Sequence, residues 1–204
     1  MKLYNSVGPN PHVVRMFMAE KGLQIPLVEV DLVKNENRGP EHLKRNPHGQ
    51  MPALELDDGS FLSEILPICE YLEDKKPSPA LIGSTPEEKA QTRMWTRRLD
   101  LNICEPMANG FRFSQGLPLF KDRIFTAPET AGGLKAMAQD RLQWLDGQMS
   151  DGREFVAGKR VSLADVLLYC FLDFGSQVGQ PLNPEFKNIN AWFARMKARP
   201  SASA

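Results

Sequence analysis

The residues able to bind a metal or form a disulfide are few, and their spacing argues against both roles. Three cysteines, Cys69, Cys104 and Cys170, lie far apart, each within an apolar, helix-like stretch. No CxxC pair and no histidine at ligand spacing accompanies them, so a zinc site and a disulfide framework are both disfavoured. We interpret the cysteines as buried structural thiols and expect no metal.

One other pair has the residue types of a catalytic site but the spacing of a helix cap. Ser162 and Asp165 form a Ser-x-x-Asp sequence immediately before an apolar run. This pattern predicts a capping box, in which each side chain binds the other residue's backbone N–H. We give the pair no part in chemistry. The three histidines lack ligand spacing; we expect His12 at a helix start, and His42 and His48 at the surface.

The charge balance excludes several classes of partner. Among 204 residues, 25 are Lys or Arg and 25 are Asp or Glu, so the formal net charge is zero. Binders of nucleic acid or of anionic membranes rely on a clustered positive excess, and we expect neither partner. No apolar run approaches the roughly 18 residues of a membrane span, and the first residues do not resemble a signal peptide. We therefore expect a cytoplasmic protein.

Hydrophobic periodicity divides the chain into a mixed part and a helical part. The patterns predict strands at residues 2–5, 26–31, 51–56 and 60–62, and helices at residues 11–21, 40–45 and 63–73. Asp57, Asp58 and Gly59 form a strong hairpin turn between the last two strands, and Ser63 is the expected N-cap of the helix that follows. The order βαβ, α, ββα implies a mixed sheet with helices on its faces.

The second part has almost no strand pattern. Residues 77–85 contain two prolines and a glycine and are predicted to be a linker. A long helix begins at Pro86, and Pro106 is expected to kink or end it. Three further helical stripes follow at residues 134–149, 163–174 and 189–196, the second so apolar that its helix should be central. Residues 86–204 are therefore predicted to form an all-helical domain.

Four short motifs, in the same order and spacing, resemble those of the cytosolic glutathione transferases of bacterial type. They are residues 8–12 (GPNPH) in the slot of the catalytic turn, 46–54 (NPHGQMPAL), which look like NPxGQVPAL, 61–72 (FLSEILPICEYL), and 161–165 (VSLAD). The resemblance covers nearly the whole chain. It implies an α+β protein with a thioredoxin-like βαβ-α-ββα glutathione-binding domain at residues 1–76 and an all-α domain at residues 86–204.

The resemblance also implies where glutathione binds. Pro52 corresponds to the family's cis-proline, which turns the backbone of Met51 outward to pair with the tripeptide as an added strand would. Glu64 would attract the γ-glutamyl ammonium, and Ile65 stands where relatives have a serine for the carboxylate. Arg38 and Gln50 are expected near the tripeptide. Each residue also has a purely structural interpretation. Pro52 could simply begin a strand, and Glu64 could be an acid that stabilises a helix start.

The catalytic turn must hold the glutathione sulfur as a thiolate, because the thiolate is the nucleophile. The slot for the donor falls on Asn10, and residues 9–12 (PNPH) look like the Pro-Asn-Gly-His turn of Nu-class relatives. We predict Asn10 as the donor to sulfur, with Ser6 as the alternate. The alternative is that Asn10 is only an N-cap before Pro11.

The second substrate is expected between the domains, in a pocket that would include Trp95, Arg98, Asn102 and Phe111. We predict a cytoplasmic, homodimeric glutathione S-transferase of detoxification type, acting on small hydrophobic electrophiles with glutathione as co-substrate. Two alternatives remain open. One is a glutathione-dependent disulfide reductase or peroxidase, and the other is a non-catalytic interaction module that keeps the fold.

Overall fold

A computed structural model describes residues 1–204, and the chain divides into two compact units. Unit 1 comprises Met1–Leu81 and Ser203–Ala204, and unit 2 comprises Ile82–Ala202. The division falls inside the segment predicted to be a linker. The last two residues belong to unit 1 and not to the helical part, and Arg15 Nε donates a hydrogen bond to the Ala204 carbonyl at 3.1 Å.

Unit 1 has the predicted βαβ-α-ββα order. Its elements are β1 (Lys2–Asn5), α1 (Pro9–Glu20), β2 (Leu27–Glu29), the 3-10 turn η1 (Glu36–Arg38), α2 (Pro40–Arg45), β3 (Ala53–Glu55), β4 (Phe61–Ser63) and α3 (Ile65–Lys75). The strands form one mixed sheet in the order β2-β1-β3-β4. Strand β1 runs parallel to β2 and antiparallel to β3, and β3 runs antiparallel to β4.

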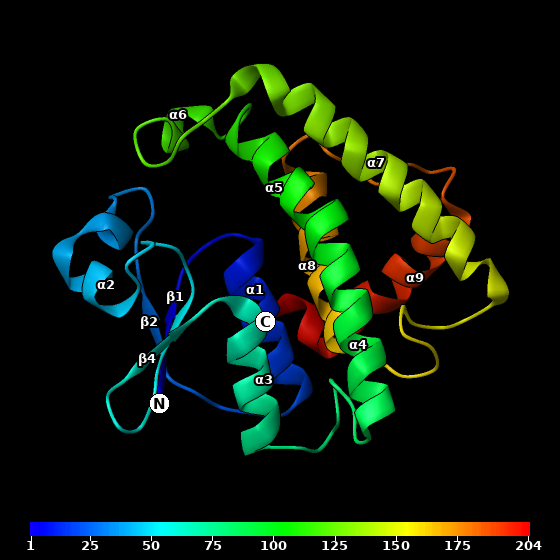
Figure 1. The fold of residues 1–204 in the computed structure, drawn as a ribbon, viewed down its shortest axis with the longest axis horizontal. Coiled ribbons are helices and arrows are strands. Elements are labelled where there is room, and N and C mark those ends of the chain that lie inside the picture. The colour runs from blue at the N-terminus through cyan, green and yellow to red at the C-terminus, as the bar shows by residue number, and fades with distance from the viewer. The chain divides into compact units, whose positions relative to one another are not determined.

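The sheet of unit 1 has helices on both faces, as the element order predicted. In Figure 1, α1 and α3 lie side by side on one face, and α2 lies on the other. Side chains on a strand point alternately to opposite faces. On β1, Leu3 is fully buried, while the next side chain, Tyr4, lies under the guanidinium of Arg45 from α2, 4.3 Å from its ring centroid.

Two helices begin at residues other than the predicted ones. Helix α1 begins at Pro9 with Gly8 as its N-cap, so Asn10 lies in the first turn and is not the cap. Helix α3 begins at Ile65 with Glu64 at the N-cap position. Ser63, the predicted cap, ends β4 and is paired with Ala53 across the sheet. Ser63 thus pairs within the sheet and does not cap α3, although its residue type favours an N-cap.

A buried ion pair fastens the end of unit 1 to its helices. Lys21 Nζ lies 2.6 Å from Glu73 Oε2, and both side chains are almost completely buried. The Lys21 ammonium also donates to the Pro79 carbonyl at 2.7 Å, and the Glu73 carboxylate accepts from Leu81 N–H at 3.3 Å. The added hydrogen bonds offset the desolvation of the two charges. The pair therefore holds residues 79–81 in place after α3.

Unit 2 is helical throughout, as predicted. It contains α4 (Pro86–Leu99), the π-helical turn η2 (Asp100–Cys104), α5 (Glu105–Arg112), α6 (Leu117–Phe120), η3 (Pro128–Thr130), α7 (Ala131–Gln148), η4 (Met149–Asp151), α8 (Leu163–Gln177) and α9 (Lys187–Lys197). The last turn, η5 (Pro200–Ser203), begins in unit 2 and ends at a residue of unit 1. Helix α8 is the central one, because its residues are mostly buried and it contacts α4, α5 and α9. Figure 1 shows it behind α4 and α5.

The long helix predicted from Pro86 does not stop at Pro106. Helix α4 passes into the π turn η2 and continues as α5, with Pro106 in the first turn of α5. A proline removes one backbone donor and crowds the turn before it. The wider π turn just before Pro106 accommodates that crowding, as insertions of this kind do within helices. Helix α4 itself begins with Thr85, whose hydroxyl accepts from Glu88 N–H.

The capping box predicted at residues 162–165 is present at the start of α8. Fully buried Asp165 accepts hydrogen bonds from Ser162 N–H and Oγ–H, from Val156 N–H and from Trp192 Nε1–H, at 2.7–2.9 Å. The three cysteines are free and buried, as expected. No helix of the protein is both long and apolar enough to cross a membrane.

Candidate functional site

The cis peptide bond predicted from the motif is present between Met51 and Pro52. The Met51 side chain is buried in a cluster with Tyr4, Val30 and Ala53. Its backbone is not used by the fold: paired strand β3 begins two residues later, and the Met51 N–H and C=O are hydrogen-bonded to no other group of the chain. An anchored side chain with a free backbone is the arrangement that pairing with an extended peptide requires.

Sheet register brings three predicted regions to one end of the sheet. Ala53 is paired with Ser63 of β4 and with Tyr4 of β1, both antiparallel. The residues just before β3 therefore lie beside those that follow β4 and β1. Met51 and Pro52 precede β3, Glu64 and Ile65 follow β4, and the loop that leads to Asn10 follows β1. The topology places the Met51, Glu64 and Asn10 regions at the same end of the sheet.

The start of α3 is unusual in its backbone. Glu64 has φ 69° and ψ 129°, and its exposed side chain makes no capping hydrogen bond. A positive φ in a residue other than glycine costs roughly 1–3 kcal/mol, and such residues gather at functional sites. The first N–H groups of a helix have no partner within it. Here these donors belong to Ile65 and Leu66, because Pro67 has none and Ile68 N–H binds the Glu64 carbonyl.

The start of α1 also lacks a side-chain cap. Gly8 at the N-cap has φ 110°, a conformation that glycine adopts without strain. Asn10 is half-buried, and its side-chain amide is hydrogen-bonded to no group of the chain. The capping alternative for Asn10 is therefore excluded by geometry, and its amide remains available to a ligand.

Ser6 is placed differently. It is 5% exposed, and its hydroxyl donates a hydrogen bond to the Val30 carbonyl at 2.6 Å, linking the end of β1 to the residue after β2. A hydroxyl has one proton to donate, and here the fold uses it. Ser6 is thus a poorer donor to sulfur than Asn10.

The loop before the cis bond is held by side chains rather than by regular structure. Arg38 Nη1 donates to the His48 carbonyl at 3.0 Å, and Asn37 Nδ2 donates to the Gly49 carbonyl at 2.6 Å. The Gln50 side chain is exposed. Gln50 is therefore part of the loop that leads to Met51, and Arg38 of η1 binds that loop.

The sequence analysis missed two residues, in and at the end of α2, that bind this loop. His42, predicted at the surface, is 2% exposed, and its Nε2 lies 3.2 Å from the Gln50 carbonyl oxygen. Asn46 is 1% exposed, and its Nδ2 donates to the same oxygen at 2.9 Å. His42 lies eight residues and Asn46 four residues before Gln50. The His-x-x-x-Asn spacing was the sequence signal that could have identified them. Burial, followed by the positive charges of Arg45 and Arg38, lowers the pKa of His42, although its hydrogen bond to Gln50 opposes the shift.

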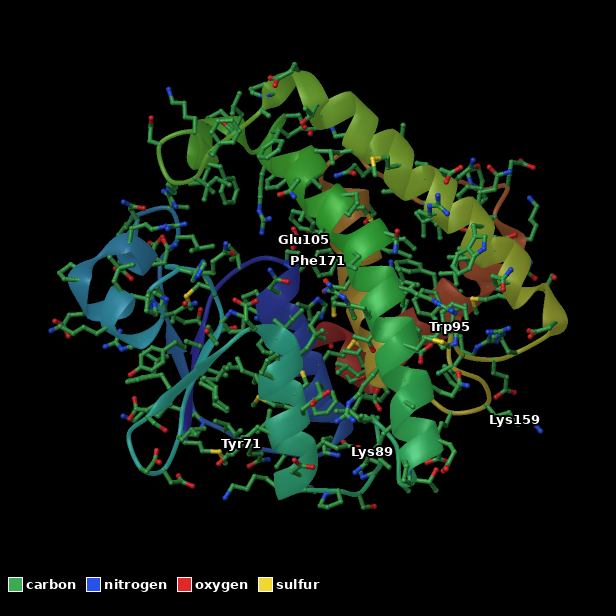
Figure 2. The ribbon with its side chains drawn as sticks, in the orientation of Figure 1. Tyr71, Lys89, Trp95, Glu105, Lys159 and Phe171 are labelled. Atoms are coloured by element: carbon green, nitrogen blue, oxygen red, sulfur yellow. The ribbon has the colours of Figure 1, made fainter.

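Of the four residues predicted to line a second-substrate pocket, Trp95, Arg98 and Asn102 lie next to one another, and Phe111 belongs to a separate cluster. Trp95 is 6% exposed and packs against Trp144 of α7, with ring centroids 6.0 Å apart. Figure 2 shows it on the side of α4 toward α7. Trp95 is thus mostly covered by unit 2, and its place in the substrate pocket stays a prediction.

The other three predicted pocket residues are exposed or half-buried. Arg98 is exposed over the Trp95 ring, and exposed Asn102 donates to the Arg98 carbonyl at 2.8 Å. Phe111 belongs to a separate half-buried aromatic cluster with Phe120 and Phe174, the latter in edge contact at 5.0 Å. Aromatic edge-to-face contacts of this kind stabilise a cluster while leaving ring faces available.

The protein's own thiols are unsuited to nucleophilic chemistry. Burial raises the pKa of Cys69 and of Cys104 far above the usual range, so both stay protonated. No group of three or more His, Cys, Asp or Glu side chains is arranged to hold a metal ion. All three cysteines are buried, so a sulfur nucleophile at the end of the sheet near Met51 would have to come from a bound molecule.

Comparison with known proteins identifies the family. Residues 1–74 match the model of the glutathione S-transferase N-terminal domain, and residues 125–200 match that of the C-terminal domain. Glutathione S-transferase 2 of Saccharomyces cerevisiae is 32% identical over 98% of this chain and 87% of its own. The crystal structure of Gtt2 from the same yeast superposes with a TM-score of 0.92 at 31% identity, over 100% of this chain and 99% of that one.

The chain belongs to the glutathione S-transferase family, whose members use glutathione as a substrate. Its thioredoxin-like and helical parts are those of the family's fold. Human elongation factor 1-gamma is also similar, 33% identical over 82% of this chain but over only 36% of its own length. The similar proteins therefore include one that is not named as a transferase.

Proposed function

We propose that this protein is a glutathione S-transferase in which glutathione binds at the end of the sheet near Met51. The observation that carries the proposal is the unpaired N–H and C=O of Met51 beside a cis-proline, at the same end of the sheet as Glu64 and Asn10. The cysteinyl backbone of glutathione would pair with Met51 as an added strand. Gln50 and Arg38 would contact the rest of the tripeptide, Arg38 on the glycyl carboxylate.

The γ-glutamyl end of glutathione would lie at the start of α3. The exposed Glu64 carboxylate would bind its ammonium group, and the N–H groups of Ile65 and Leu66 would bind its carboxylate, helped by the helix dipole. The strained Glu64 backbone supports this role, because strain of this kind persists where function requires a particular side-chain direction.

The reaction would be attack of the glutathione thiolate on an electrophilic carbon. A free thiol has a pKa of about 8.5, so only a small fraction is ionised at neutral pH. A donated hydrogen bond from the Asn10 amide would stabilise the thiolate and lower that pKa. The new carbon–sulfur bond forms as the leaving group departs with its electron pair, and no covalent intermediate with the protein is required. Trp95, Arg98, Asn102 and Phe111 are the candidates to contact the electrophile.

A second candidate function is that of a non-catalytic interaction module. Two observations favour it: Ile65 supplies no hydroxyl to the γ-glutamyl carboxylate, and elongation factor 1-gamma is among the similar proteins. A hydrogen bond to a charged group contributes about 1.5–3 kcal/mol, so its absence weakens binding. We retain the enzyme as the first proposal, together with a cytoplasmic location, a homodimeric state and a role in detoxification.

Calorimetric titration with glutathione separates these functions. The proposal expects a Kd in the millimolar range or below, and measurable conjugation of a dinitro-aryl chloride. Greater turnover of a small disulfide or a hydroperoxide than of the aryl chloride would assign reductase or peroxidase activity instead. No heat at millimolar glutathione and no turnover of any of the three substrates would establish the non-catalytic module.

A further inference from the structure

Three buried polar side chains converge on two consecutive carbonyl groups just before Met51. Asn37 Nδ2 donates to the Gly49 carbonyl at 2.6 Å, and His42 Nε2 and Asn46 Nδ2 both lie within hydrogen-bond distance of the Gln50 carbonyl, at 3.2 and 2.9 Å. The three side chains are 5%, 2% and 1% exposed, respectively. Such donors are fixed in place by the packing around them, so the carbonyls they bind are fixed as well.

The protonation of His42 follows from its partners. A carbonyl oxygen only accepts hydrogen bonds, so Nε2 must carry a proton. The other ring nitrogen, Nδ1, is buried without a hydrogen-bond partner. A proton there would add an unpaired donor and a buried charge, each of which is costly. His42 is therefore a neutral imidazole that donates from Nε2.

The Gln50 carbonyl matters because it belongs to the same peptide group as the Met51 N–H. The only cis bonds in the chain precede Pro52 and Pro79, so the peptide bond between Gln50 and Met51 is trans. In a planar trans peptide the C=O and N–H point in opposite directions. Two hydrogen bonds that draw the Gln50 oxygen toward the interior therefore turn the Met51 N–H outward, away from the fold.

We propose that His42 is a positioning residue for glutathione binding. Its Nε2–H, with Asn46, sets the orientation of the Met51 N–H, which would donate a hydrogen bond to the tripeptide. This inference rests on the proposed function, because it assigns His42 a role in the same site. His42 would not contact glutathione or the reacting sulfur. Its effect would fall on the affinity for glutathione and not on the rate at saturation.

The loop contains a matched control. His48 lies six residues further along the same segment, its side chain is exposed, and only its backbone takes part in the loop, accepting from Arg38 and donating to Asn46. His42→Gln keeps an amide nitrogen near the position of Nε2. His42→Asn and His42→Leu remove the donor from that position, the first with a polar and the second with an apolar side chain. His48→Gln changes the histidine without touching the Gln50 carbonyl.

The experiment measures the Kd for glutathione by calorimetry, and KM and kcat with a dinitro-aryl chloride, for wild type and these four variants. We expect His42→Asn and His42→Leu to raise Kd and KM about fivefold, the factor that one neutral hydrogen bond contributes, with kcat at saturating glutathione unchanged. His42→Gln should stay within about twofold of wild type, and His48→Gln should match it.

Each outcome decides one question. If wild type binds no glutathione, the proposed function fails. If wild type binds and the donor-free variants bind equally well, or if His42→Gln loses as much affinity as they do, the positioning role is refuted. A fall in kcat without a change in KM would also refute it. Thermal unfolding of each variant identifies any that is not folded, and His42→Asn replaces His42→Leu in that case.

Discussion

Two helices of this protein begin in opposite ways. At the start of α8, Ser162 and Asp165 satisfy one another's backbone, and Asp165 is fully buried. At the start of α3, Glu64 is exposed, holds a positive φ and makes no capping hydrogen bond. Helix-start donors must be satisfied by the chain, by water or by a ligand. The α8 start is completed by the protein and stabilises the fold, whereas the α3 start is left incomplete, as a binding site requires.

The largest effect should come from removing the Asp165 carboxylate at the start of α8. Asp165→Ala would leave four buried donors without their acceptor. We expect the free energy of unfolding to fall by about 4 kcal/mol, measured by urea denaturation. Ser162→Ala, which removes one hydroxyl from the box, should lower it by about 1 kcal/mol. Equal losses for the two variants would contradict the assignment of Asp165 as the centre of the network.

Asn10→Ala tests the uncapped start of α1. Because the amide binds nothing in the chain, stability should change by less than about 0.5 kcal/mol, while kcat/KM for conjugation falls about 100-fold. The control is Ser6→Ala, which should lower the free energy of unfolding by about 1 kcal/mol and leave turnover per folded molecule unchanged. Unaltered turnover in Asn10→Ala would exclude Asn10 as the donor to sulfur.

Ile65→Ser would add a hydroxyl donor for a ligand at the start of α3. A hydroxyl at this position should add one hydrogen bond to the γ-glutamyl carboxylate and lower the Kd for glutathione about tenfold. The measurement is calorimetric titration, and Ile65→Ala is the control for loss of the isoleucine alone. If serine and alanine give the same Kd, the carboxylate does not lie at this helix start.

Two substitutions of Glu64 separate the effect of its backbone strain from that of its carboxylate charge. Glu64→Gly relieves the positive φ and should raise the free energy of unfolding by about 0.5–1 kcal/mol, while affinity for glutathione falls about tenfold with the lost carboxylate. Glu64→Gln keeps the strain, so it should lose similar affinity at unchanged stability. Affinity that survives both substitutions would show that Glu64 does not bind the ammonium group.

The smallest effect concerns pH. The pKa of His42 is lowered from 6.5 in the folded state, so below that pH the unfolded chain binds more protons. The contribution of neutral His42 to stability should be complete above pH 6.5 and should decline as the pH falls toward the folded pKa. Urea denaturation between pH 5 and 8 should show this decline in wild type and a weaker one in His42→Gln. Identical profiles would mean that His42 is not buried as a neutral group.

Local patterns allowed the sequence to predict the order of elements, the buried cysteines and the α8 capping box. These features depend on residues within about four positions of one another, and periodicity or spacing records them directly. The sequence predicted Ser63 and not Glu64 at the N-cap of α3, because strand pairing between Ser63 and Ala53, ten residues apart, competed with local capping. The packing of Trp95 against Trp144 was not predicted either, because the two residues lie on different helices.

The sequence by itself determined that this chain folds as a glutathione S-transferase and which short segments form the candidate site. Only the tertiary structure decided that His42 is buried on the Gln50 carbonyl, that the Ser6 hydroxyl is used by Val30, and that Lys21 pairs with Glu73. The reason is physical: a side chain's hydrogen-bond partner depends on where the chain returns in space. That return is set by packing of the whole unit and not by the spacing of nearby residues.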